Sequence, residues 1–187
     1  MLKIEGERIY LRDYLSADLH HYHEWISNDA LMQYVNFDKT QSLEESGIKL
    51  EEAVRESQNP GGRSRYFLAV LSKQTGEFMG NCGIIIKERH EDSGIGDMGY
   101  ILLEKFWGKG YATEIANLLI GFGFHELRLH KISATCDERN KASERVMIKC
   151  GLEKEGVLKQ YRYKNGNWYN QLVYSILRDE LIRICHQ

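Results

Sequence analysis

Proline is the scarcest residue of this 187-residue chain, which contains only Pro60. Pro60 lies in "SQNPGGRS", the clearest loop signal in the sequence, between a part with helical patterns and a part rich in strand patterns. Neither part alone has the apolar segments needed to close a core, and the sequence has no internal repeat or low-complexity segment. We therefore expect residues 1–187 to form a single domain, which is an ordinary length for one.

Cysteine is also sparse and scattered. The four cysteines form no CxxC pair and no Cys/His metal spacing: Cys82, Cys136, Cys150 and Cys185. We expect reduced thiols, a cytoplasmic protein and no metal. The segment "HHYHEW" at residues 20–25 has three histidines, but no cysteine or distant histidine completes a metal site, so a polar helix face explains it better.

The chain lacks an excess of either charge and lacks long apolar runs. It has 25 Lys and Arg against 27 Asp and Glu, so it carries no broad basic footprint of the kind nucleic-acid binders have. No apolar stretch approaches membrane length, and the charged start "MLKIEGERIYLRDY" differs from a signal peptide. With 42% hydrophobic and 28% charged residues the composition is that of a globular protein, for which we expect no direct nucleic-acid or membrane partner.

The periodicity of apolar residues predicts an α/β (α+β) fold. Alternating or short apolar runs predict strands, and apolar residues at helical spacing predict helices. The predicted strands are 7–14, 65–72, 78–88, 96–104, 131–138 and a hairpin over 158–177 that turns at Asn165–Gly166, and the predicted helices are 16–28, 42–57, 141–150 and one beginning near Ala112. This order predicts a mixed, mostly antiparallel, seven-stranded sheet flanked by about four helices.

The glycine-rich stretch "FWGKGYATE" at residues 106–114 lies between a predicted strand and a predicted helix. Glycines cost backbone entropy, so they indicate a close approach to the main chain. The free N–H groups of a helix start, together with Gly108, Lys109 and Gly110, would cradle a phosphate. A nucleotide P-loop is excluded because Tyr111 follows Gly110, and the glycine spacing excludes a Rossmann fingerprint. The glycines alone would also suit a plain turn.

Four stretches in the right order resemble the GNAT superfamily of N-acetyltransferases, in particular its RimJ/RimL type, the ribosomal-protein-alanine N-acetyltransferases. They are "ERIYLRDYLSADL", "GYILLEKFWGKGYATE", "NKASERVMIKCGLEKEG" and "NGNWYNQLVYSIL", and the resemblance covers nearly the whole chain. The signature for the pyrophosphate of acetyl-coenzyme A is Gln/Arg-x-x-Gly-x-Gly/Ala, which "WGKGYA" matches except at Trp107.

The resemblance implies a site for acetyl-coenzyme A as cosubstrate. The pyrophosphate would lie on the loop, whose residues are Trp107, Gly108, Lys109, Gly110, Tyr111, Ala112 and Thr113. In the superfamily the preceding strand splays from its neighbour at a bulge, and the pantetheine arm adds to it like a further strand. Here the backbones of Ile101, Leu102 and Leu103 would bond the arm and polarise the thioester carbonyl, which supports the oxyanion as it forms.

Asn140 matches the family asparagine that contacts the pantetheine arm, and it also suits a helix N-cap. Many family members have a tyrosine seven residues later as the acid for the departing thiolate. This chain has Met147 there, which has no proton to donate. The RimL type is thought to use a helix serine instead, and Ser143 occupies that position, so the resemblance implies a catalytic and cofactor-binding role for Ser143.

A base is also needed, because the attacking amine must lose a proton. Members of this type often carry a carboxylate two residues before the "GY" of the strand, which is Asp97 here. Alternation places Asp97 either on the acceptor side of the sheet or in solvent. Many members also have an acid where Asn170 stands, and the amide lacks both charge and basicity.

The resemblance implies transfer of an acetyl group from acetyl-coenzyme A to a primary amine, with an α-amino group of a protein or peptide as the favoured acceptor. A polyamine or aminoglycoside acceptor and a non-catalytic acyl-coenzyme A sensor stay open. An acidic cluster suits either a solvated helix face or the guidance of a cationic acceptor: Glu44, Glu45, Glu51, Glu52 and Glu56. Tyr161, Tyr163 and Tyr169 would line the acceptor side or pack. We expect a monomer or a homodimer.

Overall fold

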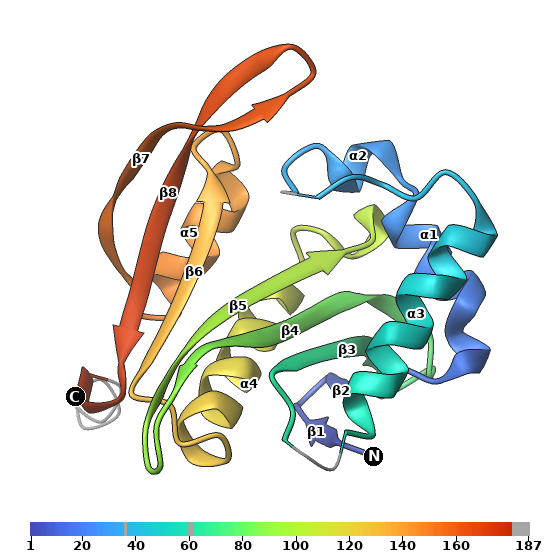
Figure 1. Cartoon of the computed structure of the whole chain (residues 1–187), viewed down its shortest axis with the longest axis horizontal. Helices are drawn as coiled ribbons and strands as arrows, with labels where there is room; N and C mark the ends of the chain where they lie inside the picture. Colours follow the sequence, from blue (N-terminus) through green and yellow to red (C-terminus); the bar gives the residue numbers. More distant parts are fainter. Residues whose placement is uncertain (36, 60–61, 181–187) are drawn as a thin grey trace.

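The computed structural model of the chain describes residues 1–35, 37–59 and 62–180. They form one eight-stranded sheet in the order β1-β2-β3-β4-β5-β6-β8-β7 (Figure 1). Neighbouring strands are antiparallel except β5 and β6, which are parallel. The strands are β1 (Lys3–Glu5), β2 (Ile9–Asp13), β3 (Arg65–Ser72), β4 (Phe78–Arg89), β5 (Gly94–Leu102), β6 (Lys131–Asp137), β7 (Glu153–Lys164) and β8 (Asn167–Leu177).

The helices cover the two faces of the sheet. The α-helices are α1 (Leu19–Ile26), α2 (Asp29–Met32), α3 (Leu43–Ser57), α4 (Tyr111–His125) and α5 (Lys141–Lys149). Short 3-10 turns span Ser16–Asp18 and Glu104–Phe106. α4 and α5 pack on one face, and α1 and α3 pack on the other over β3 and β4 (Figure 1). No helix within the described residues is long and apolar enough to span a membrane.

Strand alternation divides the core between these two faces. On β5, Met98 and Leu102 belong to the larger apolar cluster beneath α4 and α5. Ile101, one position out of phase, packs against the second cluster beneath α1 and α3. The side chains of Asp97 and Ile101 therefore share the α1/α3 face, because positions four apart on a strand lie on one side.

The predicted α/β fold with a mostly antiparallel sheet is confirmed, with one strand more than the seven predicted. The additional strand, β1, has three residues and pairs with β2. α2 has four residues and is likewise too short to show a period. The predicted turn at Asn165–Gly166 is present, and both residues have positive φ, at 50° and 79°, as a tight hairpin turn requires.

The central feature of the sheet is a fork between β5 and β6. Their pairing extends only from Ile95↔Lys131 to Met98↔Ala134. β5 continues along β4 to Leu102, and β6 continues along β8 to Asp137, so the two strands diverge beyond the last pair (Figure 1). The fork leaves two facing strand edges that have no strand partner between them.

Candidate functional site

The edge of β5 in the fork presents the backbone of every second residue. The N–H of Leu103 donates to Met79 O on β4 at 2.9 Å, and its carbonyl accepts from the N–H of Phe106 at 2.9 Å. The Ile101 carbonyl also faces β4, since a Cβ atom placed on Gly80 would meet it at 2.1 Å. In an antiparallel ladder the alternate residues direct their backbone groups to the other side. Tyr100 and Leu102 therefore face the fork.

This alternation shows which of the predicted edge residues direct their backbone groups into the fork. Of the three predicted residues, Leu102 directs its backbone toward the fork, Ile101 faces β4, and Leu103 bonds Met79 through its N–H and Phe106 through its carbonyl. Tyr100 also faces the fork, and sequence patterns alone did not identify it because the register with β4 decides which residues point outward. The Leu102 carbonyl accepts from Trp107 Nε1 at 2.7 Å, which closes the upper end of this edge.

The loop after β5 carries a row of free donors. Within the described residues, no acceptor takes a hydrogen bond from the backbone N–H groups between Gly108 and Thr113. Gly108 and Gly110 have φ of 72° and 80°, the left-handed conformation that turns these groups to one side. The row leads into α4, whose aligned peptides add partial positive charge. Such donors are the physical requirement for binding an anion such as pyrophosphate.

Arg8, from the turn between β1 and β2, fixes the loop in this conformation. Its guanidinium donates to the carbonyl of Lys109 at 3.0 Å, stacks over the ring of Tyr111 and bonds Glu114 at 2.8 Å. The Lys109 side chain donates to Lys105 O at 2.8 Å and is exposed. The main chain rather than the Lys109 ammonium therefore defines the anion cradle.

The start of α5 faces the same fork. Asn140 caps the helix, as predicted, by accepting from the N–H of Ser143 at 3.1 Å. The hydroxyl of Ser143 lies 3.2 Å from the phenol of Tyr100, a contact between β5 and α5. Met147 is buried in the larger cluster. The structure thus brings Asn140 and Ser143 together and adds Tyr100.

Asp97 lies at the base of the fork on the opposite face of the sheet. It pairs with Ser133 on β6, whose hydroxyl donates to its carboxylate at 3.2 Å. Burial raises the pKa of Asp97, although Lys87 and the bond from Ser133 act in the opposite direction. The shift makes this carboxylate a better proton acceptor than an exposed one. Asp97 and Ser143 therefore approach the fork from its two sides.

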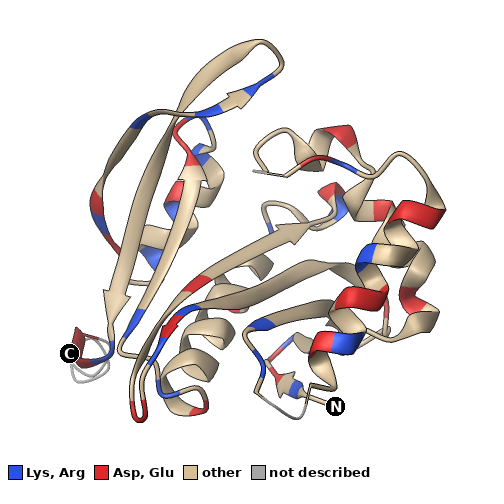
Figure 2. Cartoon of the chain, in the orientation of Figure 1, with Lys and Arg blue, Asp and Glu red and all other residues tan. Residues whose placement is uncertain are grey.

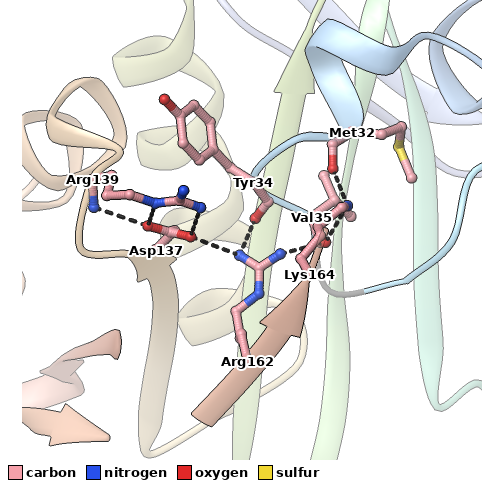
Figure 3. A network of polar contacts seen from close by, with 7 residues as sticks. All are labelled: Met32, Tyr34, Val35, Asp137, Arg139, Arg162 and Lys164. Atoms are coloured by element: carbon pink, nitrogen blue, oxygen red, sulfur yellow. Dashed lines mark hydrogen bonds and ion pairs between the residues drawn. The ribbon is translucent and has the colours of Figure 1, made fainter. Parts of the chain in front are cut away.

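A polar network connects the β7–β8 hairpin to the segment that follows α2 (Figure 3). Arg162 donates to the carbonyls of Tyr34 and Val35 at 2.6 and 2.5 Å. Lys164 donates to the carbonyls of Met32 and Val35. The hairpin and this segment thereby meet above the open end of the fork (Figure 1).

Asp137, at the end of β6, belongs to the same network. Arg139 binds its carboxylate at 2.6 Å and Arg162 lies 3.6 Å away (Figure 3). Burial would raise the pKa of Asp137, but the hydrogen bonds from Arg139 keep it below its usual value. The guanidinium of Arg139 also stacks on Tyr169. We attribute a structural role to this carboxylate because its charge is fully paired.

Beside the network lies a cavity of about 510 Å³. It lies between the segment after α2 and the outer half of the hairpin, and its lining is Val35, Phe37, Asp38, Tyr161, Arg162, Tyr163 and Lys164. Tyr161 and Tyr163 are exposed, whereas Tyr169 is half-buried beneath Arg139. Two of the three tyrosines singled out in the sequence therefore border open space at this end of the molecule.

The remaining polar motifs have local explanations. Asn170 donates to the carboxylate of Glu138 at 2.9 Å and accepts from the N–H of Gln160, so it shapes the hairpin. His23 bonds Ser46. No group of three or more His, Cys, Asp or Glu in the described part of the chain could hold a metal. Most of the acidic residues of α3 are exposed, and Figure 2 shows where the acidic positions lie along this helix. Three cysteines are free and buried, Cys82, Cys136 and Cys150, while Cys185 lies outside the described residues.

Comparison with known proteins identifies this arrangement. A family model for the acetyltransferase (GNAT) domain matches residues 8–153. The chain is similar to YoaA, an uncharacterized N-acetyltransferase of Bacillus subtilis, with 30% identity over 176 residues that span 94% of this chain and 96% of that protein.

Solved structures share the whole fold. The ribosomal-protein-S5-alanine acetyltransferase of Vibrio fischeri has a TM-score of 0.82 at 23% identity, covering 96% of this chain and 98% of that one. The spermidine N-acetyltransferase of Vibrio cholerae, solved with CoA and spermine, has a TM-score of 0.81 at 20% identity, covering 94% and 98%. At these identities the likeness concerns the fold.

Proposed function

This chain belongs to the GNAT acetyltransferase family and is an acetyl-coenzyme A-dependent N-acetyltransferase, and we propose that its acceptor is the α-amino group of a protein or peptide. The proposal takes residues 1–187 as one catalytic domain of the RimJ/RimL type, which acts in the cytoplasm as a monomer or homodimer. Its fold neighbours include enzymes for ribosomal-protein and polyamine acceptors, so the acceptor must be argued from chemistry.

The observation that carries the proposal is the continuity of unpaired backbone donors from the fork to the loop. The row from Gly108 to Thr113 would hold the pyrophosphate, with Trp107 closing the edge beside it. The N–H groups of Tyr100 and Leu102 would bond the pantetheine arm as a strand bonds its neighbour. One of these N–H groups would polarise the thioester carbonyl, where negative charge develops.

Asp97 is the group that we propose accepts the proton of the amine. It lies on the face shared with α1 and α3, and its raised pKa favours proton uptake. The amine would attack the thioester directly, because the described cysteines are buried and no base activates one as a nucleophile. Ser143, on the other face, would donate a hydrogen bond to the departing thiolate.

Proton loss favours an α-amino acceptor. An α-amino group with a pKa near 8 costs about 1.4 kcal/mol to deprotonate at pH 7, against roughly 4–5 kcal/mol for a lysine-like amine near 10.4. A site with one half-buried carboxylate and no metal group in the described residues suits the smaller cost. The second candidate is a polyamine, which the exposed carboxylates of α3 favour.

Thiol release from acetyl-coenzyme A tests the proposal directly. Purified protein is assayed with short peptides that have free N-termini, the same peptides with blocked N-termini and an internal lysine, and spermidine. We expect release with the free peptides and none with the blocked ones. Release with spermidine alone would favour the polyamine acceptor. Binding of acetyl-coenzyme A without turnover of any amine would contradict the enzyme and favour a sensor.

A further inference from the structure

The hydrogen bond between Tyr100 and Ser143 spans the base of the fork. Tyr100 is two residues beyond Met98, the last residue of β5 that pairs with β6. Its side chain lies on the α4/α5 face, packed against the larger cluster, and its phenol oxygen lies 3.2 Å from Ser143 Oγ and 3.5 Å from Ser143 O. A ligand between β5 and β6 would therefore lie over this pair.

The phenol is a permanent donor in this position. Burial raises the pKa of Tyr100 above its ordinary value and outweighs the hydrogen bond with Ser143, which lowers it, while the nearby thiols of Cys150 and Cys136 act in the same direction as burial. The phenol thus stays protonated over the whole physiological range. A serine hydroxyl has one proton and two acceptor lone pairs, and its proton rotates to suit its partners. When Tyr100 donates to Ser143 Oγ, the serine proton is free to point elsewhere.

The contacts around Ser143 leave its hydroxyl proton free to point toward the fork. Within the described residues, the Tyr100 phenol is the only hydrogen-bond partner of the Ser143 hydroxyl, and it approaches from the side of β5. Met147, one turn further along α5, is buried and has no proton to donate. We propose that Tyr100 is a positioning residue that holds the Ser143 hydroxyl as a hydrogen-bond donor toward the sulfur of the bound thioester, an inference that rests on the proposed function.

The chemistry limits this role to hydrogen bonding. When the amine attacks, the new C–N bond forms, the C–S bond breaks and its electron pair stays on sulfur. A thiolate with a pKa near 8.5 is too weak a base to take a proton from a phenol whose pKa exceeds 10. The Tyr100–Ser143 chain therefore stabilises the thiolate without transferring a proton, and the two bonds polarise each other. The thiolate takes its proton from solvent after it leaves.

Two variants and their combination test the coupling. Tyr100→Phe should lower kcat about three- to tenfold, with an unchanged Kd for acetyl-coenzyme A and an unchanged shape of the pH–rate profile. In a Ser143→Ala background the same substitution should have little further effect, since its action passes through the serine. Equal losses in both backgrounds would overturn the proposal, and so would a normal kcat for Tyr100→Phe.

Tyr174→Phe is the matched control. Tyr174 is also buried, and its phenol donates to Glu144, the residue next to Ser143 on α5, at 2.9 Å. This substitution should lower the melting temperature and leave kcat unchanged. If both phenylalanine variants lower kcat alike, the effect comes from the packing of α5, and the positioning role of Tyr100 fails.

A measurement on bound coenzyme A separates this inference from the proposed function. The thiolate absorbs ultraviolet light, so the pKa of the bound thiol follows from a pH titration against protein without coenzyme A. We expect Tyr100→Phe and Ser143→Ala each to raise that pKa by about half a unit to one unit, because Ser143→Ala removes the bond to the thiolate and Tyr100→Phe removes the bond that holds the serine hydroxyl in place. An unshifted pKa overturns only this inference, whereas failure to bind coenzyme A overturns both.

Discussion

The protonation state of Asp97 has opposite effects on the stability of the fold and on the proposed catalysis. Its carboxylate is half-buried and has one hydrogen-bond donor, Ser133. Burial therefore raises its pKa in the folded protein. A carboxyl group whose pKa is raised on folding contributes stability while it is protonated, and this contribution is lost as the pH rises through the folded pKa. The ionised form needed for catalysis is the form that destabilises the fold.

Replacing Asp97 by Asn is expected to have opposite effects on activity and stability. At neutral pH, kcat/KM should fall strongly and the affinity for acetyl-coenzyme A should stay intact. The loss should shrink at high pH, where the amine deprotonates unaided. The melting temperature should rise at neutral pH and be unchanged at a pH low enough to protonate the aspartate. Steady-state kinetics and thermal melts across pH measure both effects.

Asp92→Asn is the control for this prediction. Asp92 lies in the turn between β4 and β5, and its side chain is 79% exposed in an ion pair with Arg128. The substitution should leave the pH–rate profile and the melting temperature almost unchanged, because exposed ion pairs contribute little. If Asp97→Asn behaves like Asp92→Asn, Asp97 is a surface acid and another group accepts the proton.

At the scale of elements, the loop before α4 depends on Gly110. Its φ of 80° is strained for any residue with a Cβ atom and most of all for a β-branched one. Gly110→Val should therefore turn the free N–H groups away from their common direction. We expect the affinity for acetyl-coenzyme A to fall by more than about tenfold, equivalent to 1.4 kcal/mol, with the fold retained by circular dichroism. Isothermal titration measures the affinity.

Gly121→Ala serves as the control on the same helix. Gly121 lies within α4, and a Cβ atom there meets no other atom within 4 Å. Alanine should stabilise the helix by up to about 1 kcal/mol and leave the affinity unchanged. Unaltered affinity in Gly110→Val would show that the conformation of the loop does not define the anion site.

The polar network that joins the β7–β8 hairpin to the segment after α2 depends on Arg162, and we call these contacts the Arg162 clamp. Its side chain is 7% exposed and satisfies two backbone carbonyls. Arg162→Met should cost about 1–3 kcal/mol of stability, because the Tyr34 carbonyl loses its donor and the Val35 carbonyl keeps only Lys164. Amide exchange should accelerate in residues 31–35, and KM for the acceptor should rise with little change in the Kd of acetyl-coenzyme A.

Lys159→Met on the exposed part of β7 is the control for this prediction. Equal amide-exchange rates in the two variants would contradict the role of Arg162 in the clamp.

Local signals in the sequence were sufficient for most elements and for the loop. The cap at Asn140 and the hairpin turn each depend on a few neighbouring residues, and both are present. The structure of the site departs from the sequence prediction where segments that are distant in the sequence meet. The orientation of Tyr100 follows from its pairing with β4. The bond from Arg162 to Tyr34 joins residues that are 128 positions apart.

At the scale of the whole molecule, the fork separates two parts of one sheet. β1 to β5 form one part with α1, α3 and α4, and β6, β7 and β8 form the other with α5 (Figure 1). The contacts between them include four parallel residue pairs, the contacts of α4 with α5, the Tyr100–Ser143 bond and the Arg162 clamp. A ligand that bonds both edges would complete the sheet and couple the two parts.

Acetyl-coenzyme A should therefore stabilise the molecule as a unit. A ligand that binds only the folded state at 100 times its Kd adds about 2.7 kcal/mol, which raises the melting temperature of a domain of this size by about 5–11 °C. Amide exchange should slow on β5, on β6 and at the start of α4 together. Pantetheine without the pyrophosphate should bind far more weakly, because it leaves the donors from Gly108 to Thr113 unpaired. Equal stabilisation by pantetheine, or protection confined to one edge of the fork, would contradict this account of the site.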